Sequence, residues 1–397
     1  MSKWVPTWSF VAMDYGTVVA TYENVSQRCL LRNNLNGTAL RLRFNNLYND
    51  RPLSIAPASV ETVDRVTGKR GPRRDVTLDG QTRIVIPADA RPWSDPLLLP
   101  LRAEEDVIVW LYFQERCAVP SIAMTSAAKS WQCTQFAGNY HETDVLGYTI
   151  KGELAPILAA DPNPNQFAVG LCAVSVLTED EVQLIGAFGD SITQMSYFTD
   201  QLQERLYARY PGKCALINGG ICGNRIQKDA PVLTDFPGGG KQFGVAGRNR
   251  FLHDLYDGMM PDTVFIMEGV NDCTHSLVFQ ERDVPTAEDI YRALGEVIHM
   301  ARDHGTRRIY IGTIPPFAGF GEPWRAGAEA LRCQYNALLR AEGQADLVVD
   351  LDALMADPDD PHRMRADLHI GDGVHPNWQG GKIMAEAVMG CCFTVLI

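Results

Sequence analysis

The stretch that decides the fold is GAFGDSIT, residues 186–193. Its first three residues are the end of the apolar run VQLIGAF (182–188), whose length and composition are typical of a short buried strand. Glycine, aspartate and serine follow directly, and these residues are common in turns between regular elements. Ser191 is therefore either a residue that caps a helix or a reactive hydroxyl at a strand-to-helix turn. The rest of the chain decides between these interpretations.

The pattern of strand, loop and helix repeats from residue 182 onwards. Short apolar runs alternate with longer segments whose apolar residues recur every three or four positions. The expected strands are residues 182–188, 214–218, 263–268, 307–316 and 346–351, and the expected helices contain 201–209, 287–305, 324–343 and 380–390. Residues 229–250, which include a run of three glycines, are expected to form a loop. Alternating strands and helices predict a parallel sheet with helices on both faces.

The first part of the chain shows short strands separated by turn residues. In TALRLRF (38–44), the residues Leu40, Leu42 and Phe44 alternate and so share one face. Other expected strands are 82–87, 106–113 and 169–177. No convincing amphipathic helix interrupts them, so this part is predicted to be an antiparallel β-sandwich or jelly roll. We therefore predict two domains, an all-β domain over residues 1–180 and an α/β domain over residues 181–397.

The charge balance argues against several classes of partner. Of 397 residues, 36 are Lys or Arg and 48 are Asp or Glu, which gives a formal net charge of -12 at pH 7. Proteins that bind the phosphates of nucleic acids or an anionic membrane surface usually present a basic patch. We therefore expect no nucleic-acid partner and no membrane partner. A neutral small molecule or a carbohydrate fits the charge best.

The absence of a recognisable targeting signal and the scattered cysteines predict a cytoplasmic protein. No apolar run reaches the roughly 18 residues of a membrane-spanning helix, and the start MSKWVPTWSF lacks the features of a secretory signal. The ten cysteines are scattered and form no C-x-x-C pair, as is typical of free thiols in a reducing compartment. Neither cysteines nor histidines show a known metal-binding spacing, so we expect no metal and no other cofactor.

Polar and glycine-rich segments gather where the predicted strands end. In an open parallel sheet, ligands bind beyond the carboxyl ends of the strands. Three such segments follow strands and one precedes the last helix, namely 189–191 (GDS), 219–224 (GGICGN), 269–272 (GVND) and 372–376 (DGVHP). Because they should lie at one edge of the sheet, the sequence predicts an active site there.

Ser191, His375 and Asp372 are candidates for nucleophilic chemistry. A serine hydroxyl is a weak nucleophile and needs an adjacent base. His375 can be that base, since an ordinary imidazole titrates near about pH 6.5. Asp372 stands three residues before His375, where a tight turn can bring its carboxylate to the other ring nitrogen. Asp190 is expected to hold the turn through local hydrogen bonds instead.

Neutral donors are available for a developing oxyanion. They are the N–H of Ser191, the N–H of Gly223 and the side-chain amide of Asn271. Gly220 is an alternative to Gly223 if the loop has a different register. Trp378 and His275 are candidate substrate contacts, and simple packing is the alternative for both.

These four segments, in this order, resemble the signature blocks of the SGNH/GDSL hydrolase superfamily. The matching residues are Ser191 in GDSI, Gly223 in GICGN, Asn271 in GVND, and Asp372 and His375 in DGVHP. The resemblance covers residues 182–390 and implies a flavodoxin-like three-layer α/β fold without a metal. It also implies ester hydrolysis through an acyl-enzyme, with Ser191 as nucleophile, His375 as general base and Asp372 as orienting residue. Gly223 and Asn271 would complete the oxyanion hole with the Ser191 N–H.

The first half is similar to the β-domain that precedes the catalytic domain in one bacterial branch of this superfamily. The segments WVPTW (4–8) and RLRFNNLYNDRPLSIAPASVE (41–61) carry this looser resemblance. By resemblance, the substrate is an ester with a short acyl group, such as acetyl on a carbohydrate. Three alternatives remain open, namely an acyltransferase with the same residues, a carbohydrate-binding protein with a vestigial triad, and a lipase.

Overall fold

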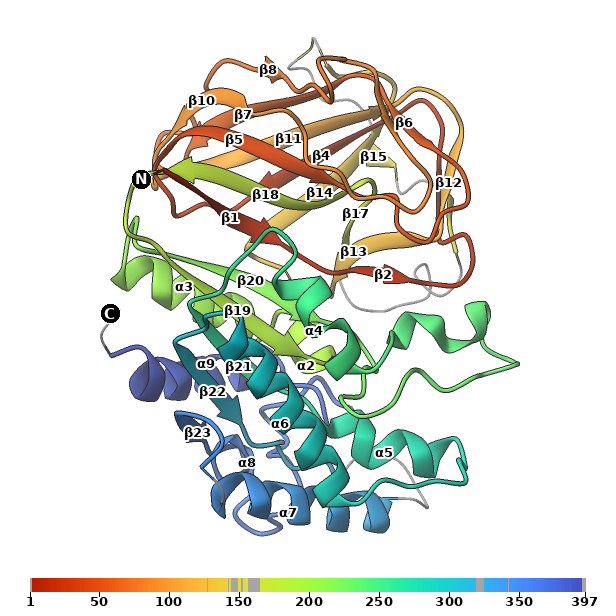
Figure 1. Cartoon of the computed structure of the whole chain (residues 1–397), viewed down its shortest axis with the longest axis vertical. Coiled ribbons are helices and arrows are strands. Elements are labelled where there is room, and N and C mark those ends of the chain that lie inside the picture. The colour runs from red at the N-terminus through yellow and green to blue at the C-terminus, as the bar shows by residue number, and fades with distance from the viewer. Residues whose placement is uncertain are drawn as a thin grey trace. The chain divides into compact units, whose positions relative to one another are not determined.

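The computed structural model describes residues 2–126, 128–141, 143, 149–150, 153–155, 165–318, 325–341 and 343–394. Backbone contacts group the chain into two units. The first unit comprises Met1–Val182, Tyr210–Ile217 and Asp235–Gly239, and the second comprises Gln183–Arg209, Asn218–Thr234 and Gly240–Ile397. Each unit has its own layers of secondary structure (Figure 1). The boundary near residue 180 as a limit between separate domains stays a prediction.

The first unit is built from antiparallel sheets. One sheet consists of β1 (Lys3–Ser9), β18 (Leu171–Thr178), β5 (Gly37–Phe44) and β10 (Leu97–Leu101), in that order. A second consists of β15 (Thr149–Ile150), β14 (Trp131–Ala137), β4 (Val25–Leu31), β11 (Glu105–Phe113), β7 (Ala58–Asp64) and β8 (Arg74–Asp75). Smaller sheets join β12 (Cys117–Val119), β3 (Ala20–Tyr22) and β16 (Glu153–Leu154), then β17 (Gln166–Ala168), β13 (Ser121–Thr125) and β2 (Ala12–Asp14), and finally β6 (Leu53–Ile55) and β9 (Ile84–Ile86). The prediction of an all-β first half is therefore confirmed.

The core of this unit lies between its two larger sheets. Leu40, Leu42 and Phe44 of β5 are completely buried, as their alternation predicts. Trp8 of the first sheet packs edge-on against Trp131 of the second, with ring centroids 5.3 Å apart. Facing sheets that share a core in this way form a sandwich.

The second unit contains a five-stranded sheet, except that the first four residues of its strand β20 (Cys214–Gly220) are grouped with the first unit. Its order is β20, β19 (Gln183–Gly189), β21 (Thr263–Met267), β22 (Arg308–Gly312) and β23 (Leu347–Val349). Neighbouring strands from β19 to β23 run parallel. Numbered along the chain, the order is 2-1-3-4-5, which is the flavodoxin-like arrangement. The predicted α/β class is confirmed. In this topology the order in which strands are added to the sheet reverses between β19 and β21, and a crevice at such a point can hold a ligand.

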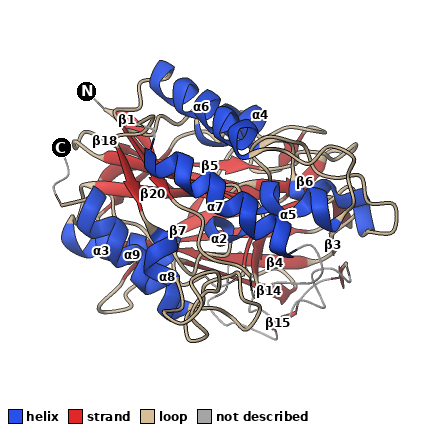
Figure 2. Cartoon of the chain, turned by 90° about the horizontal axis from the view of Figure 1, so that it is seen from below, coloured by secondary structure: helices blue, strands red, loops and turns tan. Residues whose placement is uncertain are grey.

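Helices cover this sheet in two groups (Figure 2). They are α2 (Ser191–Gln194), α3 (Thr199–Arg209), α4 (Gly247–Leu255), α5 (Val270–Val278), α6 (Ala287–Asp303), α7 (Arg325–Ala341), α8 (Leu351–Met355) and α9 (Trp378–Cys392), with a 3-10 turn over Pro237–Phe243. Helix α3 packs on α9, whereas α6 packs on both α4 and α7. The prediction of a loop over residues 229–250 is wrong at its end, because α4 begins at Gly247. Its buried face includes the charged residues Arg250 and Asp254, which hide the apolar periodicity.

Helix α6 shows how local sequence determines an element. Thr286 accepts a hydrogen bond from the Asp289 N–H, and the Asp289 carboxylate accepts one from the Thr286 N–H. This capping box satisfies donors that would be unpaired at the helix start. Gly305, with φ of 87°, follows the end of the helix. In the described part of the chain, no helix combines the length and the apolar character that crossing a membrane requires.

Candidate active site

Ser191 stands at the turn between β19 and α2. The cap of α2 is Asp190, whose carboxylate accepts a hydrogen bond from the Ile192 N–H at 3.0 Å. Because Asp190 caps the helix, the Ser191 hydroxyl is not used for this purpose. Its Oγ lies 2.8 Å from Nε2 of His375, although the two residues are 184 positions apart in the sequence.

The loop before α9 holds His375 through Asp372. One carboxylate oxygen of Asp372 accepts hydrogen bonds from the N–H groups of Val374 and His375, both at 3.0 Å. The other oxygen lies 2.5 Å from Nδ1 of His375. The short spacing therefore builds a local turn in which one oxygen fixes the backbone and the other meets the imidazole.

The charge of Asp372 follows from these contacts. Partial burial opposes ionisation, but the hydrogen bond and the attraction of His375, with the two N–H groups, outweigh it and lower the pKa of Asp372 to about 2. Asp190 behaves in the opposite way, because complete burial raises its pKa to about 6 despite the Ile192 N–H. Asp372 is thus an ionised partner for the imidazole at neutral pH.

Gly223 lies in the loop after β20 and Asn271 in the first turn of α5, and hydrogen bonds connect these two segments. Gly223 has φ of 74°, and a Cβ there would lie 2.1 Å from the ring of Phe243, so only glycine fits. The Asn271 amide donates one hydrogen to the carbonyl of Asn224 at 2.9 Å, and within the described residues its second N–H has no acceptor. The N–H of Gly220 donates to Asn218 Oδ1, which makes Gly220 the weaker candidate for an oxyanion donor.

Asp272 reinforces the same connection. Its carboxylate accepts hydrogen bonds from the N–H groups of Ile226 at 2.8 Å and Gln227 at 3.0 Å. Complete burial nevertheless raises the pKa of Asp272 to about 6. The GVND segment is therefore connected to the loop after β20 by hydrogen bonds of both Asn271 and Asp272.

The buried turn that carries Ser191, the histidine that contacts its hydroxyl and the aspartate that contacts this histidine agree with the comparison with protein families. Residues 187–383 match the model of the GDSL-like Lipase/Acylhydrolase family. This part of the chain is a GDSL-like lipase/acylhydrolase domain. The family makes it a hydrolase, as the resemblance of the four segments predicts.

The comparison with solved structures finds similarity to esterases and other proteins. One is a catalytic mutant of the acetylxylan esterase Axe2 from Geobacillus stearothermophilus, with 19% identity, a TM-score of 0.39, and coverage of 54% of this chain and 95% of that chain. Another is the acetyl xylan esterase AlAXEase, with 21% identity, a TM-score of 0.39 and coverage of 53% and 100%. A third is a lipolytic G-D-S-L family member from Veillonella parvula, with 20% identity, a TM-score of 0.37 and coverage of 54% and 100%. No curated protein matches the chain.

Arg250 of α4 connects the strand ends of the GDSL-like domain, and the sequence motifs do not reveal it. Its guanidinium donates to the carbonyl of Gly189, the last residue of β19, at 2.9 Å and to that of Gly219, the second-last residue of β20, at 2.8 Å. It also donates to Asn224 Oδ1 at 2.8 Å and to Asp254 at 2.9 Å. The side chain is buried and lies 4.2 Å from the centroid of the Phe188 ring. One side chain thus fixes the two segments that carry Ser191 and Gly223.

The two candidate substrate contacts differ in their surroundings. His275 lies one turn after Asn271 on α5, with its ring 5.2 Å from that of Phe243 and 5.1 Å from that of Phe279. Burial, followed by the charge of Arg225, lowers the pKa of His275 to about 3, so the ring is neutral at working pH. The Trp378 ring packs edge-on against Tyr197 at 5.3 Å. This contact fits the packing interpretation of Trp378.

Proposed function

We propose that the GDSL-like domain hydrolyses carboxylic esters through an acyl-enzyme formed on Ser191. The observation that carries this proposal is the continuous row of hydrogen bonds from Ser191 Oγ through the two ring nitrogens of His375 to Asp372. A serine hydroxyl bonded to an imidazole can lose its proton as it attacks, and the carboxylate stabilises the imidazolium that forms.

The first half of the reaction forms the acyl-enzyme. Ser191 Oγ attacks the ester carbonyl while its proton moves to His375 Nε2. The carbonyl oxygen becomes an oxyanion, for which the N–H groups of Ser191 and Gly223 and the Asn271 amide are the proposed donors. When the tetrahedral intermediate collapses, the bond to the leaving alcohol breaks and His375 gives that alcohol its proton.

The second half releases the acid. Water takes the place of the alcohol, loses a proton to His375 Nε2 and attacks the acyl carbon. The intermediate then collapses, the bond to Ser191 Oγ breaks, and His375 returns the proton to Ser191. Asp372 stays ionised throughout, in keeping with its lowered pKa.

We propose a short acyl group, such as acetyl on a carbohydrate, as the substrate. Support comes from the side of the site next to Gly223, where the rings of Phe243, His275 and Phe279 pack in sequence. Side chains that fill this space leave less room for a long acyl chain. The neutral imidazole of His275 is proposed to contact the substrate by a hydrogen bond and not by charge.

The test is hydrolysis of p-nitrophenyl acetate, butyrate and octanoate by the full chain and by Ser191→Ala. We expect a preference for acetate and a loss of about 10³-fold or more in kcat for the variant, since a member of the triad is removed. Ser54→Ala, in β6 of the first unit, is the matched control and should keep full activity. Equal activity of Ser191→Ala and the wild type would rule out Ser191 as the nucleophile.

The same preparation distinguishes hydrolysis from acyl transfer. An acetylated donor is incubated with and without a high concentration of a sugar alcohol, and the products are identified by mass spectrometry. Free acid as the main product in both cases supports hydrolysis. A dominant acylated sugar would instead make the protein an acyltransferase with the same residues.

A further inference from the structure

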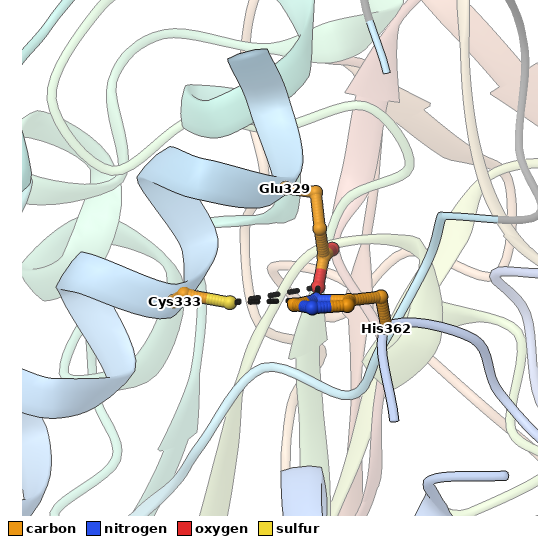
Figure 3. A group of neighbouring side chains, drawn as sticks. All are labelled: Glu329, Cys333 and His362. Carbon is orange, nitrogen blue, oxygen red and sulfur yellow. Dashed lines mark hydrogen bonds and ion pairs between the residues drawn. The ribbon is translucent and has the colours of Figure 1, made fainter. Parts of the chain in front are cut away.

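Three side chains of different chemistry meet outside the proposed active site. Glu329 and Cys333 project from one face of α7, and His362 comes from the segment that follows α8 (Figure 3). The Glu329 carboxylate oxygen Oε1 lies 3.0 Å from His362 Nδ1 and 3.6 Å from Cys333 Sγ. The remaining distance, from Cys333 Sγ to His362 Nδ1, is 3.9 Å.

These three distances describe one face of a coordination tetrahedron. Zinc binds sulfur at about 2.3 Å, imidazole nitrogen at about 2.0–2.1 Å and carboxylate oxygen at about 2.0–2.2 Å. At tetrahedral angles, such ligands are separated from one another by about 3.4–3.6 Å. The observed separations of 3.0, 3.6 and 3.9 Å each lie within about half an ångström of this range. An ion therefore fits at this face with little movement of the side chains.

The kinds of donor also select the ion. A thiolate, an imidazole and a carboxylate together suit a borderline-soft divalent ion such as Zn²⁺, whereas Ca²⁺ and Mg²⁺ prefer oxygen ligands alone. Glu329 and Cys333 are four residues apart, so one helical turn places both on the same side of α7. We propose that Glu329, Cys333 and His362 bind one Zn²⁺ ion.

Arg332 holds the carboxylate in position for this role. Its guanidinium contacts both oxygens of Glu329, with Nε 2.8 Å from Oε2. Each carboxylate oxygen has two lone pairs, so Oε1 can meet Arg332 and an ion at the same time. Arg332 is also paired with Asp352 and donates to the carbonyl of Ile314 at 2.9 Å. Arg332 thus interacts with two carboxylates, Glu329 and Asp352. In metal sites, the residues that bind the ion are usually held by hydrogen bonds to further residues of this kind.

The consequence of binding is a fixed connection between distant segments. His362 is exposed, whereas Glu329 is buried and Cys333 is half-buried. The carbonyl of His362 also accepts a hydrogen bond from the Ala318 N–H at 2.9 Å. An ion at this site would therefore hold the segment around His362 against α7 and against the chain that leaves β22. It would stabilise the fold without involving any residue assigned to ester hydrolysis.

The alternative is a network without metal. In that case His362 and Glu329 form an ion pair, and the Cys333 thiol donates a weak hydrogen bond to the same carboxylate. In such a network, replacing Cys333 by serine should change little, because serine can donate the same hydrogen bond. A metal site instead requires the thiolate and the imidazole together, and this difference decides the experiment.

The experiment measures zinc binding by the full chain. Metal-free protein, prepared with a chelator, is equilibrated with a small excess of ZnCl₂, freed of unbound ion, and analysed for zinc by mass spectrometry. We expect one zinc per chain in the wild type and at least about tenfold weaker binding by Cys333→Ser and by His362→Gln. Cys391→Ser and His299→Gln are matched controls with exposed side chains and should bind like the wild type.

A second readout shows whether Cys333 binds the ion through its sulfur. Co²⁺ in place of zinc should give the absorption of a tetrahedral cobalt–thiolate site, lost in Cys333→Ser but kept in Cys391→Ser. The midpoint of thermal unfolding should rise with zinc for the wild type and the controls only. The proposal is wrong if the wild type retains no zinc, or if Cys333→Ser and His362→Gln bind zinc as the wild type does. Neither outcome affects the ester-hydrolysis proposal, which uses other residues.

Discussion

Single residues determine the charge state of the proposed active site. Asp372 and Asp190 are both aspartates near His375, yet the pKa of the first is about 2 and that of the second about 6. The difference arises because Asp190 is completely buried with one hydrogen-bond donor, whereas Asp372 is partly exposed and faces three N–H groups, one of them on the His375 ring. The different environments thus make Asp372 a charged partner for the imidazole and Asp190 a residue that holds the turn.

A pH profile tests His375 as the base. We expect kcat/KM to rise in a single step between about pH 5 and 8, because a histidine must be neutral to accept the serine proton. Asp372 is ionised across this whole range and adds no step. Asp190 does titrate in this range, so Asp190→Asn is the control and should retain the step. A flat profile for the wild type would exclude His375 as the base.

At the scale of elements, α4 and α6 illustrate two different sources of stability. Helix α6 begins with a capping box that its own sequence provides. Helix α4 instead holds the site together through one buried side chain, Arg250, which reaches Gly189, Gly219 and Asn224. The first effect is local and small, and the second involves a buried charge on which two strand ends depend.

Arg250→Lys should damage the site while keeping the positive charge. Lysine cannot reach the same acceptors in fixed directions, so we expect a loss of about 1–3 kcal/mol in the free energy of unfolding. Displaced loops should also reduce kcat/KM by up to about 100-fold. Urea unfolding and the esterase assay measure the two effects. Arg248→Lys, two residues earlier on α4 and paired with Glu296, is the control and should be neutral in both.

Thr286→Ala should destabilise the protein without changing catalysis. The variant loses the side-chain oxygen that accepts the Asp289 N–H, which costs about 1 kcal/mol. Thermal unfolding measures this loss, and kcat/KM at 25 °C should stay at the wild-type value. Thr286→Ser restores the oxygen and should recover most of the stability. An equal loss in both variants would show that the cap does not stabilise α6.

For the whole molecule, buried acids make stability depend on pH. Asp190, Glu268 and Asp272 are completely buried, and burial raises the pKa of each. A carboxyl group whose pKa is higher in the folded state stabilises that state at low pH, and this contribution is lost as the pH rises through the folded-state pKa. For Asp272 the loss falls between its ordinary pKa of 3.8 and its folded value of about 6.

Asp272→Asn isolates this effect from the other titrating groups. Asparagine keeps one acceptor oxygen, so the variant loses one of the two hydrogen bonds that Asp272 accepts from the N–H groups of Ile226 and Gln227 at every pH. It avoids the cost of a buried charge at high pH. We therefore expect its destabilisation, measured by urea unfolding, to be smaller at pH 8 than near about pH 4.5, by about 1–2 kcal/mol. Asp359→Asn, an exposed control, should show no such change. A constant difference across pH would mean that Asp272 has an ordinary pKa.

Much of the architecture could be predicted from the sequence, because it depends on local patterns. Alternation in the first half and repeated strand–helix units in the second predict the two sheet classes, whereas the resemblance of the four motif segments predicts the family. Both predictions are confirmed. The D-x-x-H spacing is equally local, since Asp372 and His375 form a turn within four residues. The roles of Ser191, Asp372, His375, Gly223 and Asn271 in catalysis stay predictions that the Ser191→Ala assay and the pH profile begin to test.

Other features depend on residues that meet only in the folded chain. The loop after β20 favours Gly223 over Gly220 because Asn218 uses the Gly220 N–H, and Arg250 serves carbonyls that lie 31 and 61 positions away. The group of Glu329, Cys333 and His362 has no recognisable spacing, since 29 positions separate the cysteine from the histidine. Sequence periodicity determines which face of an element is buried. Contacts between side chains from different elements depend on how those elements pack, and only the tertiary structure decides them.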